Sequence, residues 1–121
     1  MSTELPIIDQ AVLDELRQSV GGDEAFVVEL ATAYLAEGQG HIDQVTEALA
    51  RGDIEAMVRP AHTLKSSSAA LGAARLSQIC KEIEHAAREG RTDNLDASVT
   101  AARAAWTDTV AAMQEMKLGG A

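Results

Sequence analysis

The sequence predicts an all-α protein, an up-and-down antiparallel four-helix bundle with an additional short N-terminal helix. The 121 residues have room for one domain of ordinary size, covering residues 1–121. Alanine, the strongest helix former, is abundant, whereas the chain holds only one Phe, one Tyr and one Trp. Seven of the nine glycines stand between stretches of helical apolar periodicity, where helix ends need a residue that tolerates positive φ.

The first part of the chain predicts a short helix and then a longer one. The short helix runs from about Asp9, a suitable N-cap, to Val20. Asp23 caps the second helix, whose apolar positions are Phe26, Val27, Leu30, Tyr34 and Leu35. Gly38 and Gly40 then either break or bend the helix before Ile42, Val45 and Leu49 continue the pattern, and we favour a break.

Three further helices are expected. One lies between Gly52 and Gly72, one between Gly72 and Gly90, and one after Gly90. The first carries a narrow apolar stripe, Ile54, Met57, Ala61, Leu64, Ser68 and Leu71. Pro60 lies within it and predicts either a kink or a late helix start. The next helix buries Leu76, Ile79, Ile83 and Ala86, with Cys80 and Ala87 beside them. The last runs roughly from Asp93 to Lys117 with Leu95, Val99, Ala102, Trp106, Val110 and Met113, and a tail from about residue 118 to 121 is expected to fray.

Composition excludes several classes of protein. Ten Lys plus Arg stand against 19 Asp plus Glu, a formal charge of −9, and this disfavours binding to nucleic acid or anionic membranes. No run approaches the ~20 apolar residues of a membrane span. The single Cys80 excludes a disulfide scaffold, and the N-terminus lacks the features of a signal peptide. A cytoplasmic, monomeric protein is therefore expected.

One histidine occupies an unusual position beside the apolar stripe. His62 follows Ala61 by one residue, so it projects about 100° from the centre of the stripe, at the edge of the core. Residues 56–81 hold no acidic residue and four basic ones, which are Arg59, Lys65, Arg75 and Lys81. The rest of the chain holds six basic and 19 acidic residues. This basic segment suits an anion bound at the histidine, although chance clustering explains it equally well.

The glycine turn at residue 72 predicts which residues face His62. If the helices on either side run antiparallel, His62 lies level with Ile83 and Glu84, within about one helical turn. A carboxylate that accepts a hydrogen bond from the imidazole Nδ1–H fixes the tautomer and leaves the Nε2 lone pair outward. The alternative is a solvent-facing Glu84 paired with Arg88 four residues later.

The run from residue 61 to 73, A-H-T-L-K-S-S-S-A-A-L-G-A, resembles the active helix of histidine phosphotransfer (HPt) domains, approximately A-H-x-L-K-G-S-S-x-x-L-G-A. The resemblance continues through Leu76, Cys80, Ile83-Glu84 and Ala87-Arg88. It implies that His62 carries a phosphoryl group on Nε2, that Lys65 helps to neutralise it, and that Glu84 lies against the histidine ring. Ser66 departs from the pattern, because many members have Gly there. Serine is also small and occurs there in some members, so we expect activity, and any effect of Ser66 to fall on partner docking.

The resemblance also implies a function and partners. The protein would be a phosphorelay intermediate between receiver-domain aspartates, with response-regulator receivers and a hybrid sensor histidine kinase as partners. It would need no cofactor of its own, because the receiver supplies Mg²⁺ and the acceptor aspartate, and no kinase activity is expected. The receiver would dock on residues around the histidine, namely Val58, Arg59, Thr63, Ser66, Ala69, Ala70 and Arg88.

Two other functions remain to be distinguished from this one. Glu82-x-x-His85 has the spacing of a di-iron bundle, but such a site needs a second pair that the sequence lacks. A non-catalytic module that docks receivers without carrying phosphate would share the fold, and the presence of His62, Lys65 and Glu84 argues against it.

Overall fold

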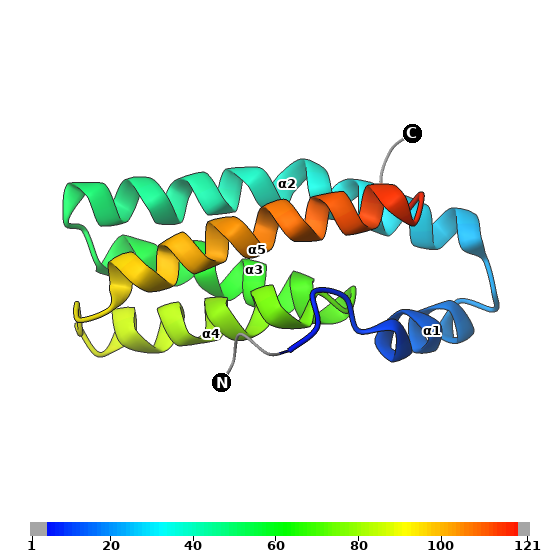
Figure 1. Ribbon diagram of the computed structural model, residues 1–121, viewed down its shortest axis with the longest axis horizontal. Coiled ribbons are helices and arrows are strands. Elements are labelled where there is room, and N and C mark those ends of the chain that lie inside the picture. The colour runs from blue at the N-terminus through cyan, green and yellow to red at the C-terminus, as the bar shows by residue number, and fades with distance from the viewer. Residues whose placement is uncertain (1–4, 119–121) are drawn as a thin grey trace.

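The chain forms a bundle of helices, seen here in a computed structural model that describes residues 5–118. Within that range there are five α-helices, one 3-10 turn and no strand. The elements are α1 (Gln10–Ser19), α2 (Glu24–Arg51), η2 (Glu55–Met57), α3 (Val58–Ala70), α4 (Ala74–Arg88) and α5 (Leu95–Glu115). Helices α2 to α5 lie side by side, with α1 at the end where α2 begins (Figure 1). The predicted fold class is confirmed.

The bundle closes because each long helix packs on two others. Helix α3 packs on α4, α4 on α5, and α2 on both α3 and α5. The predicted stripe of α3 faces this interior, since Ala61, Leu64 and Ser68 are all fully buried. Phe26, expected on the apolar face of α2, is instead 41% exposed. The buried face of α2 runs through Val27, Ala31 and Tyr34, so a side chain one position earlier points outward.

The predicted break at Gly38 and Gly40 is wrong, because α2 is one helix of 28 residues. Gly38 is buried against α5, and a Cβ added there would overlap the ring of Trp106. The Trp106 indole N–H donates to Gln39 Oε1 at 2.9 Å, and its ring meets Tyr34 edge-on with centroids 5.5 Å apart. Gly38 therefore serves the approach of a tryptophan and does not end the helix.

Pro60 marks a late helix start. The chain leaves α2 at Gly52, whose φ is 74°, and forms the 3-10 turn η2 before α3 begins at Val58. Pro60 is the third residue of α3, in the first turn, where backbone N–H groups have no helical acceptor to lose. A proline there costs no hydrogen bond of the helix interior.

An N-terminal segment fastens the turn between α3 and α4. The Asp9 N–H donates to the Gly72 carbonyl at 2.7 Å, and the Arg75 N–H donates to the Pro6 carbonyl at 3.0 Å. The Arg75 side chain adds a bond from Nε to the Leu5 carbonyl at 2.7 Å. We call residues 5–9 the N-terminal strap.

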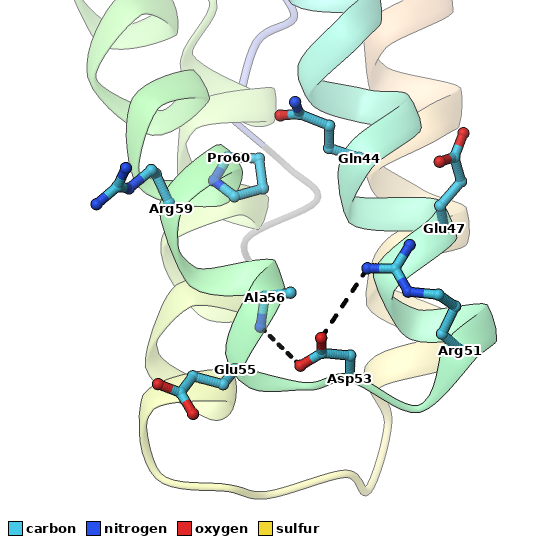
Figure 2. A pocket seen from close by; sticks show the side chains of 8 residues that line it. All are labelled: Gln44, Glu47, Arg51, Asp53, Glu55, Ala56, Arg59 and Pro60. Carbon is cyan, nitrogen blue, oxygen red and sulfur yellow. Dashed lines mark hydrogen bonds and ion pairs between the residues drawn. The ribbon is translucent and has the colours of Figure 1, made fainter.

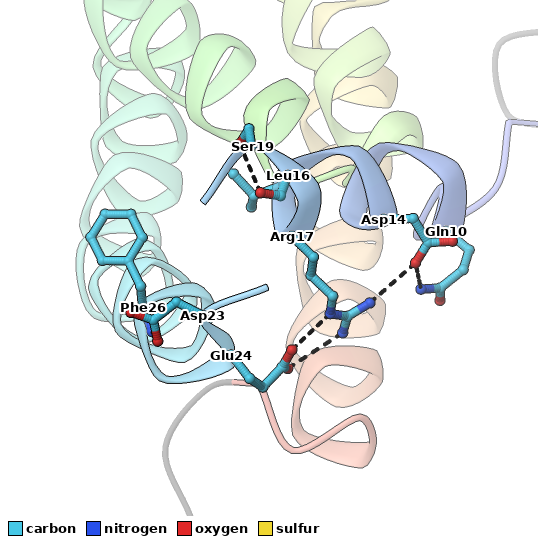
Figure 3. Close-up of polar contacts among 8 residues, drawn as sticks. All are labelled: Gln10, Asp14, Leu16, Arg17, Ser19, Asp23, Glu24 and Phe26. Atoms are coloured by element: carbon cyan, nitrogen blue, oxygen red, sulfur yellow. Dashed lines mark hydrogen bonds and ion pairs between the residues drawn. The ribbon is translucent and has the colours of Figure 1, made fainter. Parts of the chain in front are cut away.

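Helix α1 is held more lightly than the others. Leu13 is its only fully buried residue, and Arg17 ties the helix to α2 through Glu24, 2.8 Å from its Nε (Figure 3). At the other end of the chain, the predicted frayed tail is wrong for Leu118, which is fully buried and donates its N–H to the Met113 carbonyl at 2.8 Å. Residues 119–121 lie outside the described residues. No helix within residues 5–118 is long and apolar enough to cross a membrane.

Candidate functional site

The α3–α4 hairpin brings His62 and Glu84 together, as its geometry predicts. His62 Nδ1 lies 3.0 Å from Glu84 Oε2. The two side chains differ in exposure, since that of His62 is 53% exposed and that of Glu84 only 5%. One edge of the imidazole therefore faces the protein, while the rest of the ring reaches the surface.

Glu84 has two further partners, both cationic. Lys65 Nζ lies 2.8 Å from Oε1, and Arg88 places both Nε and Nη2 at 2.9 Å from Oε2. Lys65 comes from α3, three residues after His62, whereas Arg88 lies one turn beyond Glu84 on α4. The alternative of a solvent-facing Glu84 is wrong, because this side chain is buried. The pairing of Glu84 with Arg88 that the alternative included is present.

The surroundings of Glu84 decide its protonation. Burial alone raises the pKa of this carboxyl group, but its contacts with Lys65, Arg88 and His62 outweigh burial and lower its pKa to about 2. Glu84 is thus an ionised acceptor at neutral pH, and the hydrogen between it and His62 belongs to Nδ1. The Nε2 lone pair of the neutral ring then points away from Glu84.

The predicted docking residues lie on the accessible side of the hairpin. Val58 is half-buried, and the other six are exposed, namely Arg59, Thr63, Ser66, Ala69, Ala70 and Arg88. The surface next to His62 is therefore built largely from small side chains, which leave room for another protein to approach.

Two hollows lie near this surface. A groove of about 710 Å³ runs between η2 and the end of α4, with Val58, Arg59, Ala87 and Arg88 among its lining residues. A second hollow of about 630 Å³ lies between α2 and η2 (Figure 2). Its side chains form an ion pair between Arg51 and Asp53 at 4.0 Å, and His62 is not among them.

The di-iron alternative finds no ligand set among the described residues. Within residues 5–118, no three His, Cys, Asp or Glu side chains lie close enough to hold a metal ion. Glu82 and His85 are both exposed on α4.

Comparison with known proteins gives the family. The model of the Hpt domain matches residues 29–116, most of the chain. The chain belongs to the Hpt domain family. The crystal structure of histidine-containing phosphotransfer protein B (HptB) from Pseudomonas aeruginosa PAO1 is similar, with a TM-score of 0.81 and 26% sequence identity. The match covers 93% of this Hpt chain and 96% of that one. The comparison with curated proteins gives no match.

The family match and this similarity together make the chain a histidine phosphotransfer protein of phosphorelay signalling. The family model covers α3, α4 and α5 in full, and α2 from residue 29 onward. Helix α1 and the N-terminal strap lie outside the matched range.

Sequence reasoning paired Glu84 with His62 but did not join all four side chains of this Hpt site. Lys65 was expected to face a phosphoryl group, and in the structure it pairs with Glu84. Ser77 helps to set this geometry, because its hydroxyl donates to the Lys65 carbonyl across the hairpin at 2.9 Å. The available signal was spacing, since Ser77, Glu84 and Arg88 lie at steps of seven and four on one face of a helix.

Proposed function

We propose that His62 is the residue that carries the phosphoryl group, in exchange with aspartates of receiver domains. One observation carries this proposal: the 3.0 Å contact between His62 Nδ1 and the ionised Glu84, on a ring that is half exposed. In its neutral form, an imidazole held in this way is a nucleophile with its free lone pair directed at the surface.

The chemistry follows from the orientation of the ring. The Nε2 lone pair attacks phosphorus, and the bond from phosphorus to the receiver's aspartate oxygen breaks, so the aspartate leaves as a carboxylate. Nδ1 keeps its proton throughout. The ring becomes cationic, and Glu84, only 5% exposed, accepts the hydrogen bond of that cation. Transfer back to a second receiver aspartate reverses these steps.

The partners of the reaction would supply what this chain does not hold. We expect the receiver to bring Mg²⁺ and the aspartate, because phosphoryl transfer depends mainly on positioning and electrostatics. Response-regulator receivers and a hybrid sensor histidine kinase are the proposed partners. The monomeric state, the cytoplasmic location and the absence of a cofactor of its own stay predictions.

The test is transfer of label from a receiver. The purified protein is incubated with ³²P-phosphorylated receiver and Mg²⁺, and the product is treated with acid and with alkali. We expect an alkali-stable, acid-labile label that is lost completely in His62→Gln and retained in His85→Gln, the matched control on the exposed face of α4. Stable docking of the receiver without any label would contradict the proposal and identify a non-catalytic docking module.

A further inference from the structure

The charges around His62 exceed what the resting site needs. Glu84 carries one negative charge, and Lys65 and Arg88 each carry a positive one in contact with it. One cation suffices to compensate a buried carboxylate. The second is therefore surplus in the resting state, and the two cations differ in how they are held.

Arg88 makes more contacts with Glu84 than Lys65 does. Two of its nitrogens contact Glu84 Oε2 at 2.9 Å, and both residues belong to α4, so the contact does not depend on the α3–α4 packing. Lys65 makes one contact, through Nζ at 2.8 Å, from a flexible side chain on the opposite helix. It also lies one helical turn after His62, and 27% of its side chain is exposed, against 57% of that of Arg88.

A phosphoryl group on His62 would change the demands on Lys65. The group brings about two negative charges next to the lysine, and a Lys65 side chain that turns fully toward it moves its Nζ away from Glu84. Without Arg88, this movement would leave Glu84, which is 5% exposed, with the imidazole as its remaining partner, and the positive charge of that ring is offset by the phosphoryl group it carries.

We propose that Arg88 compensates Glu84 while Lys65 turns to the phosphoryl group, which makes Arg88 a positioning residue of the phosphorylated state. This inference rests on the proposed role of His62. In the transfer step the N–P bond forms as the P–O bond breaks, and the ring gains a positive charge while keeping its Nδ1 proton. Glu84 then has the ring and Arg88 as cationic partners, and Lys65 is free to move.

The first experiment compares Arg88→Gln and Arg88→Lys with the wild-type protein, and with Arg103→Gln as a matched exposed control on α5. Transfer from a phosphorylated receiver is measured over a range of receiver concentrations. We expect Arg88→Gln to lower kcat roughly tenfold, in the middle of the range for residues of one ion-pair network, with KM changed less than twofold. Arg88→Lys restores most of kcat because it keeps the charge.

A second experiment asks whether Arg88 acts through Glu84. Glu84→Gln keeps an oxygen acceptor for Nδ1 but removes the charge that Arg88 compensates. In this background we expect Arg88→Gln to change kcat less than twofold, measured under single-turnover conditions so that slow transfer is still resolved. Circular dichroism of each variant identifies any that fails to fold, and Arg88→Lys in both backgrounds then serves as the comparison.

The outcomes separate this inference from the proposed function. An unchanged kcat in Arg88→Gln, an effect confined to KM, or an undiminished effect in the Glu84→Gln background would each overturn the role given to Arg88. An effect confined to KM would make Arg88 a contact of the receiver. Absence of label on His62 in the wild-type protein would instead overturn the proposed function itself.

Discussion

Two clusters of polar side chains interrupt the apolar packing of α3, and they differ in charge and in access to solvent. Ser68 shares a 2.7 Å hydrogen bond with the Tyr34 hydroxyl, and both residues are buried and neutral. Six residues earlier, His62 contacts a charged group formed by Glu84, Lys65 and Arg88. In this group Glu84 is buried, whereas the side chains of Lys65 and Arg88 reach the surface. The neutral pair joins helices, whereas the charged group holds a reactive ring in place.

The difference shows what distinguishes a structural polar contact from a functional one in this bundle. Both clusters satisfy a buried polar group, so burial alone does not separate them. Only the charged cluster has members that can change partner without opening the core. The following predictions test this distinction and the packing of the helices around it, in order of decreasing expected effect on the free energy of unfolding.

Leu64→Asp should abolish the fold. Leu64 is fully buried on α3 between the two clusters, and an aspartate there would have no cation to pair with. We expect a loss of more than about 4 kcal/mol, detected as loss of helical circular dichroism. A soluble, fully helical Leu64→Asp protein would show that burial of a carboxylate needs no partners here, and the account of Glu84 would be wrong.

The charged cluster should make stability depend on acid. The pKa of Glu84 falls from 4.5 to about 2 on folding, so its contribution is complete above pH 4.5 and is lost as the pH falls toward 2. The shift corresponds to roughly 3 kcal/mol.

The difference in unfolding free energy between the wild-type protein and Glu84→Gln, measured with urea at pH 5.5 and pH 2.5, isolates this contribution because other carboxylates cancel. We expect the difference to shrink at the lower pH. An equal difference at both values of pH would contradict the ionised state of Glu84.

Gly38→Ala should destabilise the bundle although alanine is the better helix former. The added Cβ overlaps Trp106, and overpacking of this kind costs about 2 kcal/mol after the gain in helix propensity. Gly40→Ala is the matched control, because a Cβ there meets nothing within 4 Å, and it should stabilise by about 0.5–1 kcal/mol. Equal effects of the two substitutions in urea unfolding would show that Trp106 does not require the glycine.

Tyr34→Phe should have the smallest effect, and only on stability. It leaves the buried Ser68 hydroxyl without its tyrosine partner, at a cost of about 1 kcal/mol in urea unfolding. Transfer of phosphoryl groups to the protein should remain at the wild-type rate. A slower transfer in the folded variant would show that the neutral cluster also serves the reaction.

Much of the fold and the core of the site could be predicted because they depend on local patterns. Helical periodicity and glycine punctuation give the helices, and a short turn at Gly72 forces His62 to lie opposite Glu84. What could not be predicted depends on contacts between distant parts of the chain. Gly38 has meaning only through Trp106, which lies in another helix, and the burial of Leu118 depends on how α5 ends.

The site itself shows the same limit. The four-residue spacing on α4 allows Arg88 either to pair with Glu84 or to point into solvent. The burial of Glu84 depends on the packing of α3 on α4 and could not be predicted from this spacing. Lys65 likewise lies on the correct face in sequence, but its partner in the resting protein is set by the hairpin geometry.

The N-terminal strap has a consequence for the order of folding. His62 and Glu84 are 22 residues apart in sequence, whereas Leu5 and Arg75 are 70 apart, so closing the strap loses more chain entropy. Contacts between near neighbours in sequence generally form sooner, so we expect the reactive hairpin to assemble before the strap fastens its turn. The contact between His62 and Glu84 would thus form before the N-terminal strap bonds to the turn between α3 and α4.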